Sequence, residues 1–398
     1  MEKKLKISVY DGAIPASKFI ENLIGSLSKE NIEIYLFGKL TKGYKYNHKN
    51  IKIFPYPQNN LAIIWFLIFQ TSTLLFKNPR RLKQTIHHYR KISQKETVHF
   101  FDWWKKVLPV VNNLPDIFHI QWAKSLPKWY FLKELFNVKI VLSLRGAHIN
   151  YSPLADSDLR NTYKQLFPHV DYFHAVSKAI AEESIQYGVL SEKIKIIYSG
   201  VNLKEIEIFR KRTWRQQDKF HFVSVGRYHW KKGYHYTILA MAELIKKNMK
   251  FHYTIVAKNN PSEEIIYLIN NLGIKNNVTL ISLQSQEEVY LQMSQSDCLL
   301  LPSVEEGIAN VVLEAMAIEL PVISSNCGGM IEVINHKNNG FIFELRSITN
   351  LVDIMTSVMN MNEKKIKNIT KNARLQIEKK YHYDRLGSEM FQMYKTIN

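Results

Sequence analysis

The chain has 398 residues, 46% of them hydrophobic and 22% charged, with a formal net charge of +19. This composition excludes a disordered or fibrous protein, the length favours two globular domains, and two cysteines (Cys298 and Cys327) are too few for a disulfide framework. The positive charge favours an anionic partner, either nucleic acid, an acidic membrane face or a phosphorylated substrate, although a biased genome explains it equally well.

Short apolar runs alternate with helical patterns from one end of the chain to the other. Most runs are continuous rather than alternating, as expected for strands buried on both faces. Alternation of such strands with helices predicts an α/β fold with helices on both sides of parallel sheets. We therefore expect two Rossmann-like domains whose parallel sheets face each other across a cleft. The expected strands are 5–10, 32–37, 51–54, 117–120, 139–144, 172–176, 194–198, 220–225, 251–257, 278–281, 298–301, 321–324 and 340–343.

The first strand begins almost at the amino terminus. The apolar run after Lys4 is too short for a signal peptide, so we expect a cytoplasmic protein. The strand is followed by Asp11-Gly12-Ala13 and contains no G-x-G-x-x-G pattern, which argues against a nicotinamide-dependent dehydrogenase.

Residues 61–76 (LAIIWFLIFQTSTLLF) are strongly apolar. They are fewer than the about 20 residues of a spanning helix, and polar residues interrupt them. One interpretation is a helix lying on an anionic membrane surface, at the inner face of the cytoplasmic membrane. The other is a helix buried in the core. The basic residues that follow are Lys77, Arg80, Arg81, Lys83, Arg90 and Lys91.

The polar segment 203–219 separates the two blocks of alternating elements. We interpret it as a linker between an N-terminal domain, residues 1–202, and a C-terminal domain, residues 220–382.

Residues 300–329 (LLPSVEEGIANVVLEAMAIELPVISSNCGG) carry the most chemical information. A buried strand leads into a loop with Glu306 and Gly307, and a helix follows from about residue 309. Glycine lets the backbone approach a ligand closely, and the amides of Ile308, Ala309 and Asn310 suit a phosphate group. Glu306 and Glu314 can each accept hydrogen bonds from vicinal hydroxyls. The alternative is that both are solvated surface acids.

Residues 222–233 (FVSVGRYHWKKG) form a second candidate element. A strand ends at Gly226-Arg227, and Lys232-Gly233 opens the next helix. An arginine and a lysine at such turns can neutralise a departing nucleotide diphosphate. No cluster of His, Asp or Glu has metal-ligand spacing, so we expect no metal site.

Together these segments resemble the glycosyltransferase family 4 group with the GT-B fold. The family pattern of Gly-Arg…Lys-Gly followed by Pro-Ser-x-x-Glu-Gly-x6-Glu-Ala-Met-Ala matches Gly226-Arg227…Lys232-Gly233 and the run from Pro302 to Ala317. The resemblance continues through Gly328-Gly329, Glu332 and Asn339-Gly340, and in Ile197-Tyr198-Ser199-Gly200-Val201-Asn202, where such enzymes cross into the second domain.

The resemblance implies a retaining, metal-independent transferase with no cofactor, whose donor substrate is a nucleotide-diphosphate sugar. Arg227 and Lys232 would bind the diphosphate, Glu306 the sugar and Glu314 the ribose. The acceptor, a saccharide or lipid-linked saccharide in cell-surface polysaccharide synthesis, would bind the N-terminal domain. The final helix, about residues 383–398, would pack back on that domain. Acceptor-side candidates are Gly12, His119, Arg145 and His148.

The chain departs from the family pattern at three places. Lys258-Asn259-Asn260-Pro261 replaces a Gly-rich turn, Gln121 stands where a second histidine is frequent, and Arg145-Gly146-Ala147-His148 replaces a His-Gly-x-Asp pattern. The resemblance therefore assigns neither a donor-binding role to this loop nor a catalytic histidine.

Three rival functions remain open. A GT-B epimerase or phosphorylase would bind a similar ligand, although a phosphorylase cofactor lysine gives no signal. A basic nucleic-acid-binding protein fits the charge, but the chain has no recognised nucleic-acid module, and we therefore expect no nucleic-acid partner. A non-catalytic scaffold would not need the four charged residues of the donor pattern.

Overall fold

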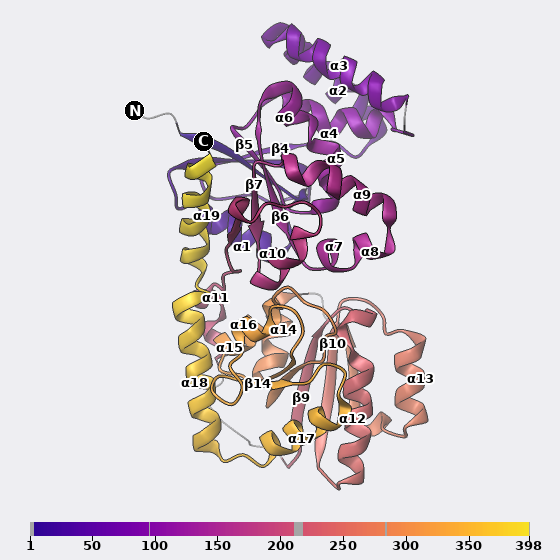
Figure 1. Cartoon of the computed structure of the whole chain (residues 1–398), viewed down its shortest axis with the longest axis vertical. Coiled ribbons are helices and arrows are strands. Elements are labelled where there is room, and N and C mark those ends of the chain that lie inside the picture. Colours follow the sequence, from indigo (N-terminus) through magenta and orange to yellow (C-terminus); the bar gives the residue numbers. More distant parts are fainter. Residues whose placement is uncertain (1–3, 95, 211–217, 283–284, 398) are drawn as a thin grey trace. The chain divides into compact units, whose positions relative to one another are not determined.

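The chain forms two compact units, each built around its own parallel sheet (Figure 1). The first unit comprises Met1–Val176, Ala181–Ile197 and Asp384–Asn398, and the second comprises Ser177–Ile180 and Tyr198–Tyr383. The structure, a computed structural model, describes residues 4–94, 96–210, 218–282 and 285–397.

The sheet of the first unit has eight strands in the order β2-β3-β1-β5-β6-β7-β8, with β4 paired to β3. Neighbouring strands are parallel, so β1, β5 and β6 all end at the same edge of the sheet. The strands are β1 (Leu5–Tyr10), β2 (Gly12–Ile14), β3 (Ile32–Leu40), β4 (Ile51–Pro55), β5 (Ile117–Ile120), β6 (Lys139–Leu144), β7 (Tyr172–Ala175) and β8 (Ile194–Ile196).

Helices from both ends of the chain share the core of this unit. Ile20 and Leu23 of α1 and Met390 and Tyr394 of α19 are buried in one apolar cluster with Ile7 of β1. The last helix therefore belongs to the first unit although it is distant in sequence. The helices are α1 (Lys18–Leu27), α2 (Asn60–Lys77), α3 (Pro79–Ser93), α4 (Phe100–Asn112), α5 (Leu126–Trp129), α6 (Phe131–Phe136), α7 (Ala147–Asn150), α8 (Ser152–Ala155), α9 (Ser157–Leu166), α10 (Lys178–Ile185) and α19 (Tyr383–Ile397).

The second unit has a six-stranded parallel sheet in the order β11-β10-β9-β12-β13-β14. The order reverses at β9 and β12, which is where open α/β sheets bind ligands. Its elements are β9 (Phe220–Gly226), α12 (Tyr234–Lys246), β10 (Phe251–Ala257), α13 (Glu263–Asn271), β11 (Val278–Ser282), α14 (Gln286–Ser294), β12 (Cys298–Leu301), α15 (Asn310–Ala317), β13 (Val322–Ser325), α16 (Met330–Val333), β14 (Phe341–Phe343), α17 (Ile348–Met359) and α18 (Glu363–Lys380), preceded by α11 (Leu203–Ile206).

Every strand expected from the sequence is present, with ends that differ by three residues at most, the largest difference being at the end of β3. The strand missed is β2. It follows β1 after a single residue and begins at Gly12, whose φ of +94° turns the chain out of β1 and onto the edge of β3. Three residues carry too little hydrophobic pattern to be recognised as a strand.

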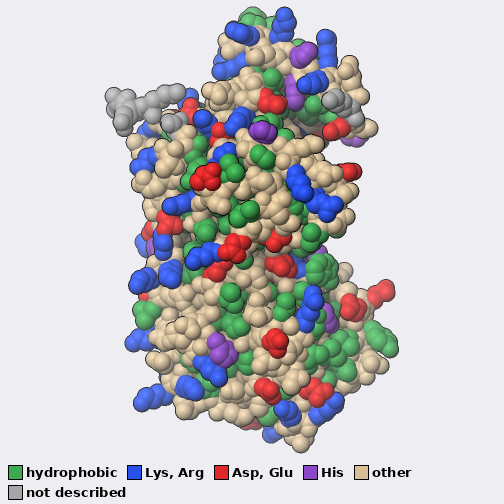
Figure 2. Space-filling view, viewed as in Figure 1, with side chains coloured by type: hydrophobic (Ala, Val, Ile, Leu, Met, Phe, Trp, Pro, Cys, Tyr) green, Lys and Arg blue, Asp and Glu red, His purple; other side chains and the backbone are tan. Residues whose placement is uncertain are grey.

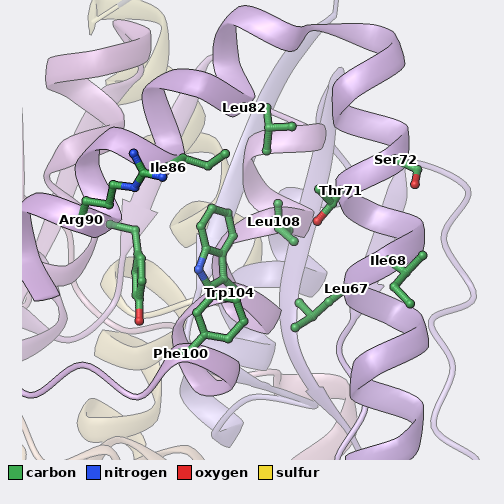
Figure 3. Close-up of a pocket in the computed structure, with 11 residues that line it drawn as sticks. Leu67, Ile68, Thr71, Ser72, Leu82, Ile86, Arg90, Phe100, Trp104 and Leu108 are labelled. Atoms are coloured by element: carbon green, nitrogen blue, oxygen red, sulfur yellow. The ribbon is translucent and has the colours of Figure 1, made fainter.

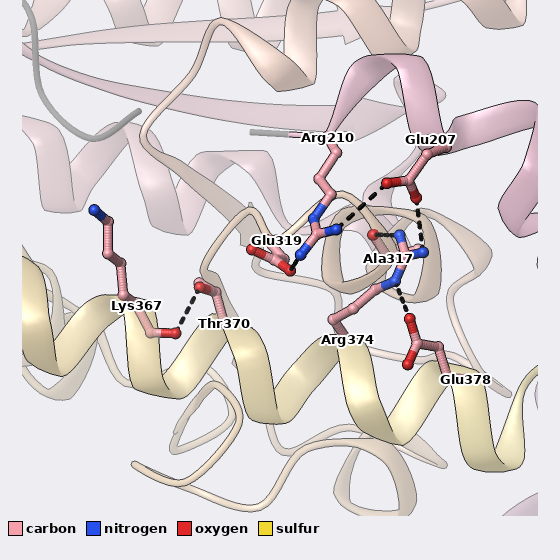
Figure 4. A network of polar contacts seen from close by, with 8 residues as sticks. All are labelled: Glu207, Arg210, Ala317, Glu319, Lys367, Thr370, Arg374 and Glu378. Carbon is pink, nitrogen blue, oxygen red and sulfur yellow. Dashed lines mark hydrogen bonds and ion pairs between the residues drawn. The ribbon is translucent and has the colours of Figure 1, made fainter. Parts of the chain in front are cut away.

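The expected linker 203–219 is wrong over the part that the structure describes before residue 211. Ile206 is buried in the core of the second unit, and Phe209 packs against Tyr290 with ring centroids 5.5 Å apart. Polar contacts hold the same segment (Figure 4). Nη2 of Arg374 in α18 lies 2.8 Å from Oε2 of Glu207, and Arg210 pairs with Glu319. The polar sequence thus reflects ion pairs with the second unit rather than an open linker; residues 211–217 lie outside the described residues.

The chain passes into the second unit at Tyr198, four residues before the expected boundary at 202. Tyr198 donates a hydrogen bond to Oε2 of Glu332 at 3.0 Å, and its ring lies 5.3 Å from that of Tyr381. Ser177–Ile180 also belongs to the second unit, because the amides of Lys178 and Ala179 donate to the carboxylate of Glu332.

Replacing Arg374 tests how firmly the segment before residue 211 is held. Arg374 is only 8% exposed and also donates to the carbonyl of Ala317, so Arg374→Ala removes the hydrogen bond to that carbonyl and the ion pairs with Glu207 and Glu378. We expect a loss of about 1–3 kcal/mol in the free energy of unfolding of the second unit, measured as a lower melting temperature by circular dichroism.

Lys367→Ala in the same helix is the matched control. Lys367 forms an exposed i,i+4 pair with Glu363, which contributes at most about 0.5 kcal/mol. Equal effects of the two substitutions would show that the network around Arg374 does not anchor the segment.

Candidate functional site

Glu306 is the centre of a buried ion-pair cluster in the second unit. It lies in the loop between β12 and α15 and is 7% exposed. Nζ of Lys232 lies 2.6 Å from Oε1, Nζ of Lys231 lies 3.5 Å from Oε2, and Oγ of Ser303 donates to Oε1 at 3.0 Å. Two elements predicted separately, the Lys-Gly turn after β9 and the Glu-Gly loop after β12, therefore meet in space.

The charge state of this cluster follows from the balance of burial and pairing. Burial raises the pKa of the Glu306 carboxyl. The charges of Lys232 and Lys231, together with the hydrogen bonds from Lys232 and Ser303, lower it by a larger amount. The pKa therefore lies below its ordinary value of 4.5, and Glu306 is ionised at neutral pH. Two lysines facing one carboxylate leave a net positive charge for an anionic ligand.

Glycines allow the backbone around Glu306 to close up. A Cβ atom at Gly328 would lie 1.8 Å from the carbonyl oxygen of Glu306, and one at Gly233 would lie 2.1 Å from that of Pro302. No side chain can be accommodated at these distances. Gly328 and Gly233 thus hold the Glu306 loop against β13 and the start of α12.

The amino terminus of α15 agrees only in part with the predicted phosphate site. The helix begins at Asn310 and has no side-chain cap, which leaves its first amides without a helical partner. The amide of Ala309, however, is buried and faces Sδ of Met330 at 3.5 Å. The amide of Ala309 is therefore covered by a side chain, whereas Ile308 and Asn310 are partly accessible and Gly307 is buried.

Glu314 lies in the second turn of α15 and is held from α14. Nε2 of Gln286 and Oη of Tyr290 each donate to its carboxylate at 3.3 Å. Both bonds fix the orientation of Glu314 on the side of the helix that faces α14.

Gly226 and Arg227 line a cavity of about 250 Å³ at the carboxyl end of β9. Lys258, Ser285 and Gln286 line it as well, so Gln286 links this cavity to Glu314. Arg227 is exposed and has no ion-pair partner among the described residues. The cavity therefore combines a free guanidinium with groups that lead to the second carboxylate.

The loop at residues 258–261 takes part in this cavity although it lacks the glycines of the family pattern. Lys258 lines the cavity, and the side chain of Asn259 accepts from the amide of Tyr228 at 2.9 Å and donates to its carbonyl at 3.2 Å. The side chain of Asn259 thus braces the turn that carries Arg227. The sequence showed no signal for this contact.

A second polar cluster lies in the first unit, where β1, β5 and β6 end. Nη2 of Arg145 donates to Oε1 of Gln121 at 2.9 Å, and its guanidinium lies 4.7 Å from the ring centroid of Phe19. Trp122 donates its indole N–H to the carboxylate of Asp11. Burial lowers the pKa of Arg145 to about 10, which leaves it charged, and burial raises the pKa of Asp11 against the opposing effects of Trp122 and Arg145.

Several polar atoms of this cluster are buried and have no partner among the described residues. They are Nε2 of Gln121, Nε of Arg145 and Nδ1 of His148. Unpaired buried polar atoms are costly, so they mark a place where a ligand or water completes the hydrogen bonds. Arg145 and His148 are thus brought together with Asp11, Gln121 and Trp122.

His148 lies beside Trp122, with ring centroids 5.3 Å apart. Burial and the charge of Lys124 lower its pKa to about 4, so the imidazole is neutral at physiological pH. Gly12 belongs to the same edge of the sheet, where its carbonyl accepts from Oη of Tyr56 at 3.2 Å.

His119 is predicted as an acceptor-side residue, but the structure does not place it in this cluster. It is fully buried, with Nδ1 2.6 Å from Oη of Tyr394 and Nε2 2.8 Å from Oγ of Ser143. Burial holds its pKa well below the ordinary range. Both ring nitrogens are occupied, so His119 joins α19 to the sheet and is not available to an acceptor.

Helix α2 is an exposed apolar helix and not a core helix. Only Ile63 and Leu74 are buried, whereas Trp65 is 72% exposed and Phe69 67%. The core-helix interpretation of residues 61–76 is therefore wrong. Among the described residues α2 is the one helix long and apolar enough, by length and composition, to cross a membrane, and 17% of it is buried.

The part of the chain that the structure describes contains no group of three or more His, Cys, Asp or Glu side chains placed to hold a metal ion. The two cysteines are buried, and no disulfide joins them in the part of the chain that the structure describes.

Family models match nearly the whole chain. The model of the glycosyl transferases group 1 matches residues 205–376, and that of glycosyltransferase family 4 matches residues 16–205. The chain belongs to glycosyltransferase family 4. The boundary between the two matches, at residue 205, lies close to the point where the chain enters the second unit.

Curated relatives are 25–29% identical to this chain over the segments that align. A glycosyltransferase of Methanocaldococcus jannaschii is 29% identical over 55% of this chain and 58% of its own length. The amylovoran biosynthesis glycosyltransferase AmsK of Erwinia amylovora is 27% identical over 60% and 61%. The N-acetyl-alpha-D-glucosaminyl L-malate synthase of Bacillus anthracis is 25% identical over 71% and 74%. The match thus spans about three fifths of the first two relatives.

Solved structures share the fold over the full length. A glycosyltransferase of Rickettsia africae has a TM-score of 0.71 at 16% identity, covering 99% of both chains. HepE of Anabaena, solved with UDP and glucose, has a TM-score of 0.69 at 17% identity, also over 99% of both chains. The expected GT-B fold is therefore confirmed.

The lowered pKa of Glu306 predicts a defined pH dependence of stability. Because the folded-state pKa is depressed, the pair stabilises the second unit fully above the ordinary pKa of 4.5, and this stabilisation is lost as the pH falls through the lower, folded-state value. The excess melting temperature of the wild type over Glu306→Gln should thus be constant from pH 7 to pH 5.5 and shrink below about pH 4.5.

Melting curves of both proteins across this range measure the effect, with Glu263→Gln, an exposed carboxyl of α13, as control. A difference between wild type and Glu306→Gln that does not change with pH would contradict the pairing.

Proposed function

We propose that this protein transfers a hexose-type sugar, with retention of anomeric configuration, from a nucleotide-diphosphate sugar to a saccharide or lipid-linked saccharide. The observation that carries the proposal is the buried Lys232–Glu306 pair beside the exposed Arg227. Such a pair presents cations and one carboxylate within a few ångströms, as a sugar diphosphate requires. Retention is the outcome that membership of family 4 implies.

The second unit would bind the donor. In the proposed complex, Arg227 and Lys232 contact the diphosphate together with the amides of Ile308 and Asn310. Glu306 accepts hydrogen bonds from sugar hydroxyls and Glu314 from ribose hydroxyls. The cavity of about 250 Å³ beside Arg227 and Gln286 would hold part of the nucleoside.

Lys232 would also act in the chemical step. As the bond between the anomeric carbon and the phosphate oxygen breaks, negative charge grows on the leaving diphosphate. Lys232 and Arg227 stabilise that charge, while Glu306 stays ionised and keeps Lys232 in position. The leaving phosphate would assist removal of the acceptor hydroxyl proton. These cations take the place of a metal ion, and we propose no cofactor and no nucleic-acid partner.

The first unit would bind the acceptor through the polar cluster of Arg145 and His148. Its unpaired buried donors suit the hydroxyl oxygens of a sugar, and Asp11 and the Trp122 ring provide an acceptor and an apolar face. Two of the curated relatives take part, by name, in the biosynthesis of amylovoran and of colanic acid, so we propose a role in envelope polysaccharide synthesis.

We propose further that the first unit works at an anionic membrane surface. Helix α2 exposes Trp65 and Phe69, and Arg80, Lys83 and Lys91 lie exposed on the adjoining α3. Figure 2 shows Lys and Arg side chains gathered at the end of the first unit where α3 lies. An apolar face beside basic side chains favours binding to anionic headgroups.

A screen of UDP-, GDP-, ADP- and TDP-sugars tests the donor site by thermal shift and slow hydrolysis, with and without a chelator. One donor should stabilise the wild type, and Lys232→Ala and Glu306→Ala should each weaken its binding by at least about tenfold, the value of a charged hydrogen bond. Lys246→Ala, at an exposed position of α12, should bind normally. Loss of hydrolysis on chelation would overturn metal independence, and absence of any nucleotide binding would overturn the function.

Cosedimentation with phosphatidylglycerol vesicles tests the membrane proposal. The wild type should bind at low salt and detach as the ionic strength rises, because about 1 kcal/mol per basic residue is screened. Trp65→Glu should reduce binding at least about tenfold by placing a charge in the apolar face. Leu291→Glu, on an exposed apolar residue of α14, is the control. Equal binding of wild type and Trp65→Glu would count against α2 as the contact.

A further inference from the structure

An apolar cavity of about 610 Å³ lies among α2, α3 and α4 in the first unit (Figure 3). Its size falls in the range of about 300–1,000 Å³ that small-molecule sites occupy. The side chains of Trp104 and Leu108 come from α4, and the walls on either side belong to α2 and α3. The apolar walls are Leu67, Ile68, Leu82, Ile86, Trp104 and Leu108.

The cavity opens beside the apolar surface of α2. Ile68 is 52% exposed and Phe100 50% exposed, yet both line the cavity, so they form its mouth. Trp65 and Phe69, the residues proposed to contact the membrane, belong to the same helix as Ile68. A hydrocarbon chain can therefore enter the cavity from the membrane without crossing a polar barrier.

Two groups of the cavity are suited to the polar end of such a chain. Arg90 lines it and is exposed, and no carboxylate pairs with its guanidinium in the described part of the chain. Nε1 of Trp104 is buried and has no hydrogen-bond acceptor among the same residues. Arg90 can pair with an anionic headgroup, and Trp104 can donate to a headgroup or ester oxygen.

Side chains that line an unfilled apolar cavity of this size make fewer dispersion contacts. Water does not fill such a cavity favourably, because it finds few hydrogen-bond partners there. A second copy of the chain is a poor occupant, since each copy carries a net charge of +19 and the basic residues of α3 would face each other. The combination of apolar walls with a cation at the mouth selects an anionic amphiphile.

We propose that this cavity binds the hydrocarbon chain of an anionic membrane lipid, with the headgroup on Arg90. The inference rests on the proposed membrane association and extends it from surface contact to the capture of a single lipid. Such a lipid holds the first unit at a fixed depth and orientation. The site does not include the donor residues, so donor hydrolysis is independent of it.

Calorimetric titration with monoacyl phosphatidylglycerol below its micelle concentration tests the proposal. We expect this lipid to bind the wild type saturably. Glycerol phosphate, which lacks the hydrocarbon chain, should not bind. Thr71→Trp places an indole inside the cavity and should weaken binding at least about tenfold, whereas Leu75→Trp, on the exposed side of α2, should not.

Arg90→Gln separates the headgroup contact from the chain. It should weaken binding of monoacyl phosphatidylglycerol by about fivefold to tenfold and affect monoacyl phosphatidylcholine less, because the choline cation offsets the charge of the phosphate. Arg80→Gln, on the same helix but outside the cavity, is its control. Because Arg90 and Arg80 are both exposed, these variants remain informative if Thr71→Trp fails to fold.

The outcomes distinguish this site from the two proposals on which the function rests. Vesicle binding without binding of the monoacyl lipid would overturn the cavity site and leave the membrane contact intact. Equal binding by wild type, Thr71→Trp and Arg90→Gln would also overturn it. Donor hydrolysis should be unchanged in all four variants, so a loss of lipid binding with normal hydrolysis supports the cavity alone.

Discussion

The ionised carboxylate of Glu306, buried almost completely, is the constraint on which the second unit depends. A buried charge of this kind is tolerated only with partners of opposite charge and filled hydrogen bonds. Lys232, Lys231 and Ser303 meet this requirement because β9 and β12 are neighbours and parallel, which brings the loops after both strands to one edge. Glycines at 233 and 328 then let the surrounding backbone close to contact distance. The sheet order, the glycines and the charged side chains are thus all required to form this one cluster.

In the first unit, charged side chains are also paired at the carboxyl edge of the sheet, but fewer of their hydrogen bonds are formed. Arg145 and Asp11 carry opposite charges, and Gln121 and Trp122 provide hydrogen bonds to them. Buried nitrogen atoms of Gln121, Arg145 and His148 nevertheless have no hydrogen-bond partner among the described residues. A sheet edge with complete pairing favours a rigid anion site, whereas one with unpaired donors favours an exchangeable polar ligand. This contrast matches the division between donor and acceptor binding proposed for the two units.

Most of the fold could be predicted from the sequence, because parallel strands buried on both faces produce continuous apolar runs that polar loops interrupt. β2 could not be predicted, since three residues show no periodicity. Residues 203–210 were predicted as a linker because charged residues that pair with Glu319 and Arg374 cannot be told from solvated ones in the sequence alone. In the proposed donor site, the motif spacing predicted Arg227, Lys232, Glu306 and Glu314. The contact between Lys232 and Glu306, and the contacts of Asn259 and Gln286, depend on distant segments that no local pattern reveals. His119 shows the reverse error: a residue at a suggestive position whose ring is already engaged by Tyr394.

That contact between His119 and Tyr394 has a consequence for dissecting the chain. The N-terminal unit is discontinuous, because α19 supplies Met390 and Tyr394 to its apolar core and a phenol to a buried imidazole. A fragment that ends after β8 would expose the apolar groove that α19 fills. It would also leave Nδ1 of His119 without its hydrogen-bond partner inside the sheet. No single cut of the chain separates the two units. During synthesis the first unit cannot be completed until α19 has been made, so it is completed only after the whole of the second unit has been synthesised.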